Sequence, residues 1–311
     1  MKKLILKLIL LMVLLSGLFM VPELLSLDDG TKALSAKLTN SEDFLEMNTG
    51  IRSICPVIER AGAEDGATVL IIGDSIAGQL FNRLGDNDNG VTVCCANAAI
   101  NITGQYMLAK TFLDSHPEAT DIWLFMHPLT LTRTYDMNLG YGYSVMPFVE
   151  TGLIDELDSN TIDQMASVYG RIALSREAVD LIERSPLNRK LFLNYIMMHN
   201  EEYHQSNAYE ISEQYILKLR DLCDERGVAF HFYSSPSTEY YRESNEDTRA
   251  DFEMTALYEL YPDYLDSIYY FPTEWSEDMT HFGYEYASED VYDEVIRDAY
   301  EDFNSEIYSY M

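Results

Sequence analysis

The sequence predicts an α/β fold, a three-layer α/β/α sandwich built around a mostly parallel sheet. Helical patterns alternate with short apolar segments over more than 200 residues, as crossovers between parallel strands require. The apolar segments are rich in β-branched and aromatic residues, which suits strands buried on both faces. These expected strands are 67–72, 91–96, 122–126, 228–233 and 267–271.

The segments between the strands carry apolar residues at helical spacing. In 208–226, Ile211, Tyr215 and Leu219 recur every four residues, and Gly227 stands where a helix often ends in a left-handed residue. Residues 132–207 lack the alternation with strands, and we expect an insertion or cap there, with helical stretches at 175–184 and 191–199. The other expected helices are 76–84, 105–115, 248–260 and 285–303.

The N-terminal segment is typical of an export signal. Lys2, Lys3 and Lys7 precede an apolar run that reaches residue 21. At about 1.5 Å per residue, a helix over 4–21 just crosses a ~30 Å hydrocarbon core. Because no small-x-small cleavage pattern follows, we favour an uncleaved signal anchor over a cleaved signal peptide.

The domain organisation follows from that signal. Residues 1–22 form the signal anchor or signal peptide, 23–65 a polar stem or docking segment, and 66–305 the main domain. The expected location is the cell membrane, with a single pass through the N-terminal helix and the main domain outside the cytoplasm. Cleavage of the signal would make the protein secreted.

Composition excludes several classes of function. The chain has 311 residues, with 52 acidic and 21 basic side chains and a formal charge of −31. Nucleic acids are bound by clustered positive charge, so no nucleic-acid partner is expected. The same charge counts against a strongly anionic substrate. A hydrophobic content of 47% excludes a disordered acidic tail.

The cysteine and histidine pattern predicts no metal site and no cofactor. Cys94 and Cys95 are adjacent on an expected strand and point to opposite faces, so at most one of them easily meets Cys55 or Cys223. The four residues fit either a disulfide in an exported chain or buried free thiols. No Cys/His cluster has metal-ligand spacing.

Two segments carry candidate chemistry. Ser75 follows an expected buried strand and begins a helix, at the edge of the sheet where open α/β folds bind ligands. Asp278 and His281 follow the last expected strand, at a spacing that lets the carboxylate bond to the imidazole and fix its tautomer. Taken separately, Gly-Asp-Ser is also an ordinary turn and helix-cap sequence, and an Asp and a His can share a surface loop.

Together these segments resemble a known family. VLIIGDSIAGQLF (69–81) and EDMTHFGYEYASEDVYDEVI (277–296) look like the first and last motif blocks of the SGNH, or GDSL-like, hydrolase superfamily, in the same order. The resemblance implies a flavodoxin-like sandwich. It also implies that Ser75 is a nucleophile, His281 its general base and acid, and Asp278 the carboxylate that orients the histidine.

The middle blocks of the family match less closely. The resemblance places an oxyanion loop at 97–104, where Asn97 is retained. The family's glycine falls at Ile102, and the nearest glycine is Gly104. The third block lies in 126–130 and lacks its usual Asn; His127 or Thr130 could replace that donor, although His127 also fits simple packing at a strand end.

The resemblance gives two alternative functions. One is an extracytoplasmic serine esterase or O-acyltransferase that acts on acylated cell-envelope glycan or another ester, beside a membrane-bound acyltransferase. The other is a catalytically inactive, membrane-tethered scaffold or glycan-binding module. The altered third block favours the scaffold, whereas the retained Ser, Asp and His favour the enzyme. Hydrogen-bonding distance between Ser75 and His281 would distinguish them, since a scaffold has no need of it.

Overall fold

The α/β class and the parallel sheet predicted from the sequence are confirmed. The computed structural model describes residues 53–86, 90–96, 101–135, 141–184 and 203–300, together with Lys7 and Ile9. Four strands pair in the order β2-β1-β3-β4, and every pairing is parallel. Their bounds are Val69–Gly73 (β1), Val91–Cys95 (β2), Asp121–Phe125 (β3) and Ala229–Tyr233 (β4).

Alternating side chains of the strands supply two separate cores. Leu70 and Ile72 of β1 belong to one buried cluster, and Val69 and Ile71 belong to the other. This period-two alternation is what a strand with covered faces on both sides requires. The sheet is therefore the middle layer of the domain.

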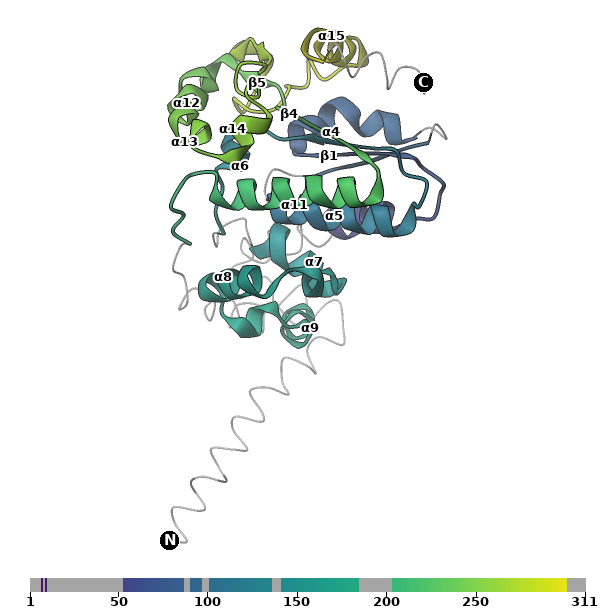
Figure 1. Ribbon diagram of the computed structural model, residues 1–311, viewed down its shortest axis with the longest axis vertical. Coiled ribbons are helices and arrows are strands. Elements are labelled where there is room, and N and C mark those ends of the chain that lie inside the picture. The colour runs from purple at the N-terminus through teal and green to yellow at the C-terminus, as the bar shows by residue number, and fades with distance from the viewer. Residues whose placement is uncertain are drawn as a thin grey trace.

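Helices cover both faces of this sheet (Figure 1). The helices α4 (Ser75–Phe81) and α15 (Glu289–Ala299) lie over one face. On the other face, α5 (Ile102–Ser115) packs against α11 (Glu210–Arg226). The first of these begins three residues before the expected start, because the Asn101 side chain caps it by accepting the N–H of Gly104.

The segment expected to be an insertion forms a helical layer outside α5 and α11 (Figure 1). It contains α7 (Met146–Glu150), α8 (Ser159–Tyr169) and α9 (Arg176–Arg184). Tyr215 of α11 joins the two layers through a 2.5 Å hydrogen bond from its hydroxyl to Thr161 of α8. Short turns complete this region: η2 (Tyr141–Val145), η3 (Leu153–Glu156) and η4 (Arg171–Leu174).

Residues 53–61 are helical and belong to the main core. Ile54 and Ala61 are fully buried there, and Arg60 donates to the carbonyl of Val93 in β2. The folded unit thus begins before residue 66, where we expected the domain to start. Apart from Lys7 and Ile9, the expected membrane segment at 1–22 lies outside the described residues, as does most of 23–65. Every helix in the described part of the chain is too short or too polar to cross a bilayer.

The last third of the chain departs from two expectations. The expected strand 267–271 shrinks to β6 (Tyr270–Phe271), which pairs with β5 (Ser237–Thr238) in a separate two-stranded sheet, so it is not a fifth strand of the main sheet. The expected helix 248–260 is two helices, because Thr255 caps a new one by accepting the N–H of Tyr258.

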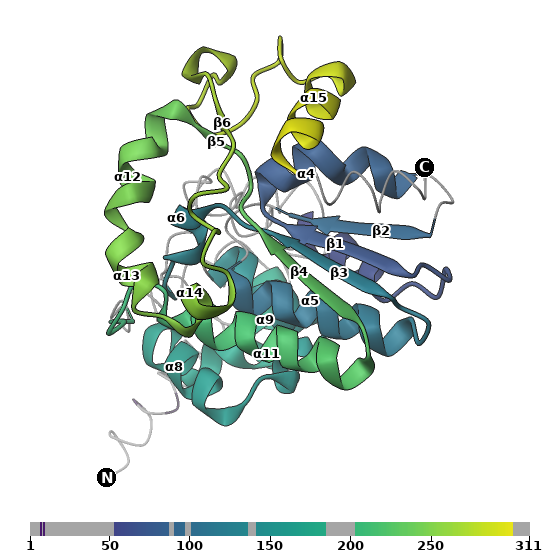
Figure 2. The same ribbon diagram turned by 45° about the horizontal axis from the view of Figure 1, so that its top comes forward.

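The remaining short elements lie at the side of the main sheet, next to α6 (Pro128–Leu131), as Figure 2 shows. They are η5 (Glu239–Tyr241), α12 (Arg242–Asp247), α13 (Arg249–Glu253) and α14 (Ala256–Leu260). Two other turns are η1 (Asn82–Asp86) after α4 and η6 (Thr273–Trp275) after β6.

Candidate active site

Gly73, the last residue of β1, allows the backbones of β1 and β3 to approach each other closely. A Cβ atom at this position would lie 2.4 Å from the carbonyl oxygen of Phe125 and 2.8 Å from the Cβ of Ala77. Both distances are far below van der Waals contact, so only glycine fits here without a shift of the backbone. The carbonyl of Gly73 also accepts a 3.0 Å hydrogen bond from the buried Gln105. The two residues that follow are thereby fixed relative to the sheet.

Asp74 is buried and joins three elements at the end of β1. Its Oδ1 atom accepts the N–H groups of Ile76 (3.0 Å) and Ala77 (3.1 Å), and so caps α4. The same atom accepts the hydroxyl of Ser235 at 2.9 Å, and Oδ2 accepts the N–H of His127 at 2.7 Å. Burial raises the pKa of this carboxyl, although the four hydrogen bonds oppose the change.

Ser75, His281 and Asp278 form a continuous chain of hydrogen bonds. The Oγ of Ser75 lies 2.7 Å from Nε2 of His281, and Nδ1 of His281 lies 2.7 Å from Oδ2 of Asp278. The structure therefore brings Ser75 next to two residues that lie more than 200 positions later in the sequence. Because a carboxylate can only accept, Nδ1 carries the proton that it donates to Asp278, and Nε2 is left to accept the Ser75 hydroxyl.

The loop of His281 is held from within. Asp278 Oδ1 accepts the N–H groups of Thr280 (2.9 Å) and His281 (2.8 Å). Met279, which lies between Asp278 and Thr280, adopts a φ of 67°, in the left-handed region that residues other than glycine rarely occupy. Its carbonyl accepts the Thr238 hydroxyl at 2.7 Å. Strained backbone held this way occurs preferentially at functional sites.

Gln79 ties the same loop to the helix of Ser75. Its side-chain amide donates to the carbonyl of Phe282 and accepts the N–H of Phe282, both at 3.0 Å. Gln79 lies one helical turn after Ser75, so the two residues share a face of α4. This pair of bonds sets the position of His281 relative to Ser75, and sequence reasoning did not find it.

The charge of Asp278 suits its contact with His281. Partial burial by itself raises the pKa of a carboxyl, but here the hydrogen bonds from the His281 ring and from two N–H groups outweigh it. The pKa of Asp278 consequently lies below its ordinary value, and the group is an anion throughout the neutral range. An anion at this position stabilises positive charge on the imidazole when it takes up a proton.

A small cavity opens beside Ser75. Its volume is about 100 Å³, which corresponds to roughly three water molecules at about 30 Å³ each. The lining includes Ser75, His127, Thr130, Arg133 and Tyr241. A space of this size accepts a short acyl group.

Of the expected oxyanion residues Ile102, Gly104 and Thr130, which the structure describes, only Thr130 lines the cavity. Asn97 lies outside the described residues. Ile102 and Gly104 are in the first turn of α5 and do not line the cavity. The N–H of Gly104 donates to Asn101, at 3.0 Å to its carbonyl and 3.4 Å to its side chain. Thr130 does line the cavity, and its side chain is 6% exposed.

His127 has a packing role, as one interpretation of the sequence expected. Its Nδ1 accepts the N–H of Leu129 at 3.2 Å, so Nε2 carries the proton and donates to Ser237 Oγ at 2.8 Å. Burial, followed by the nearby charge of Arg133, lowers the pKa of His127 to about 4. Both ring nitrogens are occupied, which leaves none to replace the missing asparagine.

Arg133 and Tyr241 also line the cavity, although the sequence analysis did not single them out. Arg133 is three residues after Thr130, and a basic residue so near a strand end is a weak signal in an acidic chain. Tyr241 comes from a turn more than 100 residues away, and its hydroxyl lies 3.3 Å from that of Thr280. No sequence pattern marks it.

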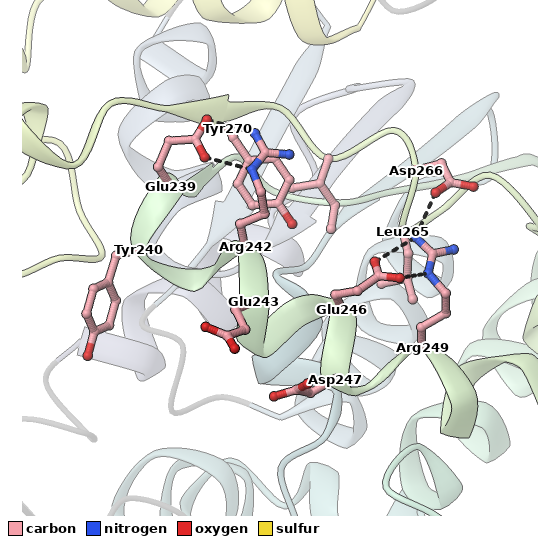
Figure 3. Close-up of a pocket in the computed structure, with 11 residues that line it drawn as sticks. Glu239, Tyr240, Arg242, Glu243, Glu246, Asp247, Arg249, Leu265, Asp266 and Tyr270 are labelled. Carbon is pink, nitrogen blue, oxygen red and sulfur yellow. Dashed lines mark hydrogen bonds and ion pairs between the residues drawn. The ribbon is translucent and has the colours of Figure 1, made fainter.

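A larger groove of about 650 Å³ lies over η5 and α12 (Figure 3). Arg242 stacks on the ring of Tyr270 at 3.9 Å and forms an ion pair with Glu239. Arg249 bridges Glu246 and Asp266. The cations of the groove are paired in this way, and its lining contains no serine, histidine or cysteine. The smaller cavity at Ser75 is therefore the candidate active site.

The cysteines form no disulfide. All four lie among the described residues and are free thiols. Burial raises the pKa of Cys94 and of Cys223 to about 12, so both stay protonated and unreactive at neutral pH. Of the two expectations, buried free thiols are the one observed, with Cys55 only partly buried.

Comparisons of this chain with protein-family models, with curated proteins and with solved structures found no match.

Proposed function

We propose that this protein is an extracytoplasmic serine esterase or O-acyltransferase of the SGNH type, acting on acylated cell-envelope glycan. The hydrogen-bonded chain Ser75–His281–Asp278 at the end of β1 is the observation that carries the proposal. Both distances are 2.7 Å, the geometry that a serine nucleophile and its base need. In this proposal the domain has the flavodoxin-like sandwich of that superfamily, and residues 1–22 anchor it in the membrane.

The reaction follows from the proton positions. Nε2 of His281 takes the Ser75 proton while Oγ attacks the acyl carbonyl. The histidine then gives this proton to the departing alcohol oxygen as its bond to the acyl carbon breaks. Water or a sugar hydroxyl next gives its proton to His281 and attacks the acyl carbon. The bond from that carbon to Oγ then breaks, and His281 returns the proton to Oγ, which regenerates Ser75. Water makes the protein an esterase, and a sugar hydroxyl makes it an acyltransferase.

The sizes of the cavity and the neighbouring groove support a substrate that carries a short acyl group on a polymer. The 100 Å³ cavity fits an acetyl-sized group. The groove starts at Tyr240, which is 56% exposed and adjoins Tyr241 of the cavity. Exposed aromatic rings of this kind stack on apolar ligand faces. Glu243 and Asp247 of the groove pair with no cation in the described residues, which disfavours a polyanionic chain.

The competing proposal is a non-catalytic scaffold beside a membrane-bound acyltransferase. The observation in its favour is that two expected donors are already used within the fold, because the Gly104 N–H bonds to Asn101 and the His127 ring bonds to Ser237. Loss of one oxyanion donor costs about 2.7–4 kcal/mol of transition-state stabilisation. The short Ser75–His281 bond is the observation against it.

Fluorophosphonate labelling of the full chain in mild detergent tests the enzyme proposal. We expect labelling at Ser75 that is abolished by Ser75→Ala and by His281→Ala. The exposed Ser167 and His204 provide matched controls, so Ser167→Ala and His204→Ala label like the wild type. Folded wild-type protein that stays unlabelled, or equal labelling of Ser75→Ala, would support the scaffold.

A further inference from the structure

Some hydrogen-bond donors around the cavity at Ser75 already bond to other protein groups, and others do not. The N–H groups of Ile76, His127, Leu129 and Thr280 each donate to a side chain of the surrounding network. The hydroxyls of Tyr241 and Thr280 lie 3.3 Å apart and bond to each other. These four N–H groups are not available to a bound ester, whereas one of the two hydroxyls keeps its hydrogen, because only one of them donates to the other.

Three further donors of the cavity are not used by the fold. The N–H of Ser75 is at the first position of α4, where a helix offers no acceptor of its own. The Thr130 hydroxyl has no hydrogen-bond partner in the described part of the chain, and its oxygen is not fully buried, so a ligand in the cavity can reach it. The Arg133 guanidinium has no carboxylate within ion-pair distance among the described residues.

Arg133, which pairs with no carboxylate in the part of the chain that the structure describes, stands out because the chain is so acidic. Most cations of the described residues form ion pairs, including Arg242 and Arg249 of the neighbouring groove. Arg133 is partly buried and lines a cavity of only about 100 Å³ together with Ser75. Its positive charge is close enough to His127, another lining residue, to contribute to the lowered pKa of that histidine. A guanidinium in this place meets whatever negative charge develops on a group attached to Ser75.

We infer that Arg133, with the Thr130 hydroxyl and the Ser75 N–H, binds the oxyanion of the acyl transfer reaction. This inference rests on the proposed function. The carbonyl oxygen gains its negative charge when Ser75 Oγ bonds to the carbonyl carbon, and loses it when the alcohol leaves. A fixed cation beside that oxygen stabilises the transition state more than the neutral ester, so it raises kcat. Arg133 thus replaces the side-chain amide that the third motif block lacks.

The alternative role for Arg133 is recognition of an acidic group on the substrate. That role predicts a loss only for anionic substrates and mainly in KM. The oxyanion role predicts a loss in kcat for every ester, neutral or charged. The two roles are therefore separated by one neutral and one anionic ester of the same leaving group.

The test uses the full chain in detergent with 4-nitrophenyl acetate and the hemisuccinate of 4-nitrophenol. For Arg133→Met we expect kcat to fall about 10²–10³-fold with both esters, with a similar fall in the rate of fluorophosphonate labelling. Arg133→Lys keeps the charge and retains part of the activity. Arg176→Met, at an exposed site on α9, keeps wild-type rates.

Three results would overturn the inference. The first is an unchanged kcat for folded Arg133→Met with both esters. The second is a loss confined to the hemisuccinate, which assigns Arg133 to substrate recognition. In both cases the wild type remains active, so the proposed function stands. The third is a wild type that neither labels nor hydrolyses either ester, in which case the proposed function fails and this inference fails with it.

Discussion

Replacing Asp74 by Asn is expected to destabilise the fold strongly, although the two side chains have nearly the same shape. The carboxylate accepts hydrogen bonds at both oxygens, three at Oδ1 and one from the N–H of His127 at Oδ2. An Asn has one acceptor oxygen. If that oxygen keeps the Oδ1 bonds, the amide NH₂ faces the N–H of His127, and a buried donor meets another donor.

The size of the effect follows from that lost bond. A hydrogen bond to a charged group contributes about 1.5–3 kcal/mol, and a buried donor without a partner costs about 1–3 kcal/mol. Burial raises the pKa of Asp74, which shows that its charge is costly to bury, and a neutral Asn removes part of that cost. We therefore expect Asp74→Asn to lower the free energy of unfolding by about 2–4 kcal/mol.

Urea unfolding of the full chain in detergent, followed by tryptophan fluorescence, measures this loss. Asp158→Asn is the matched control, because Asp158 caps α8 but is exposed at the surface. Asn caps a helix as well as Asp does, and the ion pair of Asp158 with Lys218 is a surface pair, so the control should lose less than about 1 kcal/mol. Equal losses in the two variants would refute the reasoning.

Four further substitutions test the site and the fold. Gly73→Ala should cost at least about 2 kcal/mol in urea unfolding, because the new Cβ meets backbone at 2.4 Å; a wild-type midpoint would contradict that. Gln79→Leu should lower kcat up to about 10²-fold at near-constant KM by releasing the loop of His281, and unchanged kcat would exclude this positioning role. Asp278→Asn should lower kcat about 10²–10⁴-fold, since an amide favours the wrong histidine tautomer, and ester hydrolysis at the wild-type rate would argue against it. Burial depresses the pKa of His127 to about 4, so the neutral imidazole contributes fully to the free energy of unfolding above pH 6.5. About 3 kcal/mol of that free energy is lost as the pH falls from 6.5 to 4. Urea midpoints across that window should fall less steeply for His127→Gln, and parallel curves would refute the assignment.

The chemical pattern of the site could be predicted because parallel strands end at one edge of a sheet. The apolar run before Gly73 predicted β1 and placed Ser75 at that edge. Asp278 and His281 were expected to follow a fifth strand of the same sheet, but β6 belongs to a separate sheet, and the loop after it brings His281 to Ser75. The strand order β2-β1-β3-β4 was not predicted, whereas the parallel sheet and its two packed faces followed from alternation and length. These features depend on neighbours in the sequence.

Other features depend on contacts between distant segments, and a linear pattern does not encode those. The role of Asp74 needs donors from α4, His127 and Ser235, and only packing brings them together. Likewise, β6 contains apolar residues like those of the main strands but pairs with β5 instead.

The sequence by itself determined the α/β class, the parallel strands and the residues that meet as Ser75, His281 and Asp278. The tertiary structure alone decided which donors are left to bind a substrate. Gly104 is the glycine nearest to the expected motif position, but its N–H bonds to Asn101 at the start of α5. Arg133 matched no motif, lines the cavity and has no ion-pair partner among the residues that the structure describes. The physical reason is that each polar hydrogen bonds to the nearest acceptor in space, and that acceptor is fixed only when the whole chain has packed.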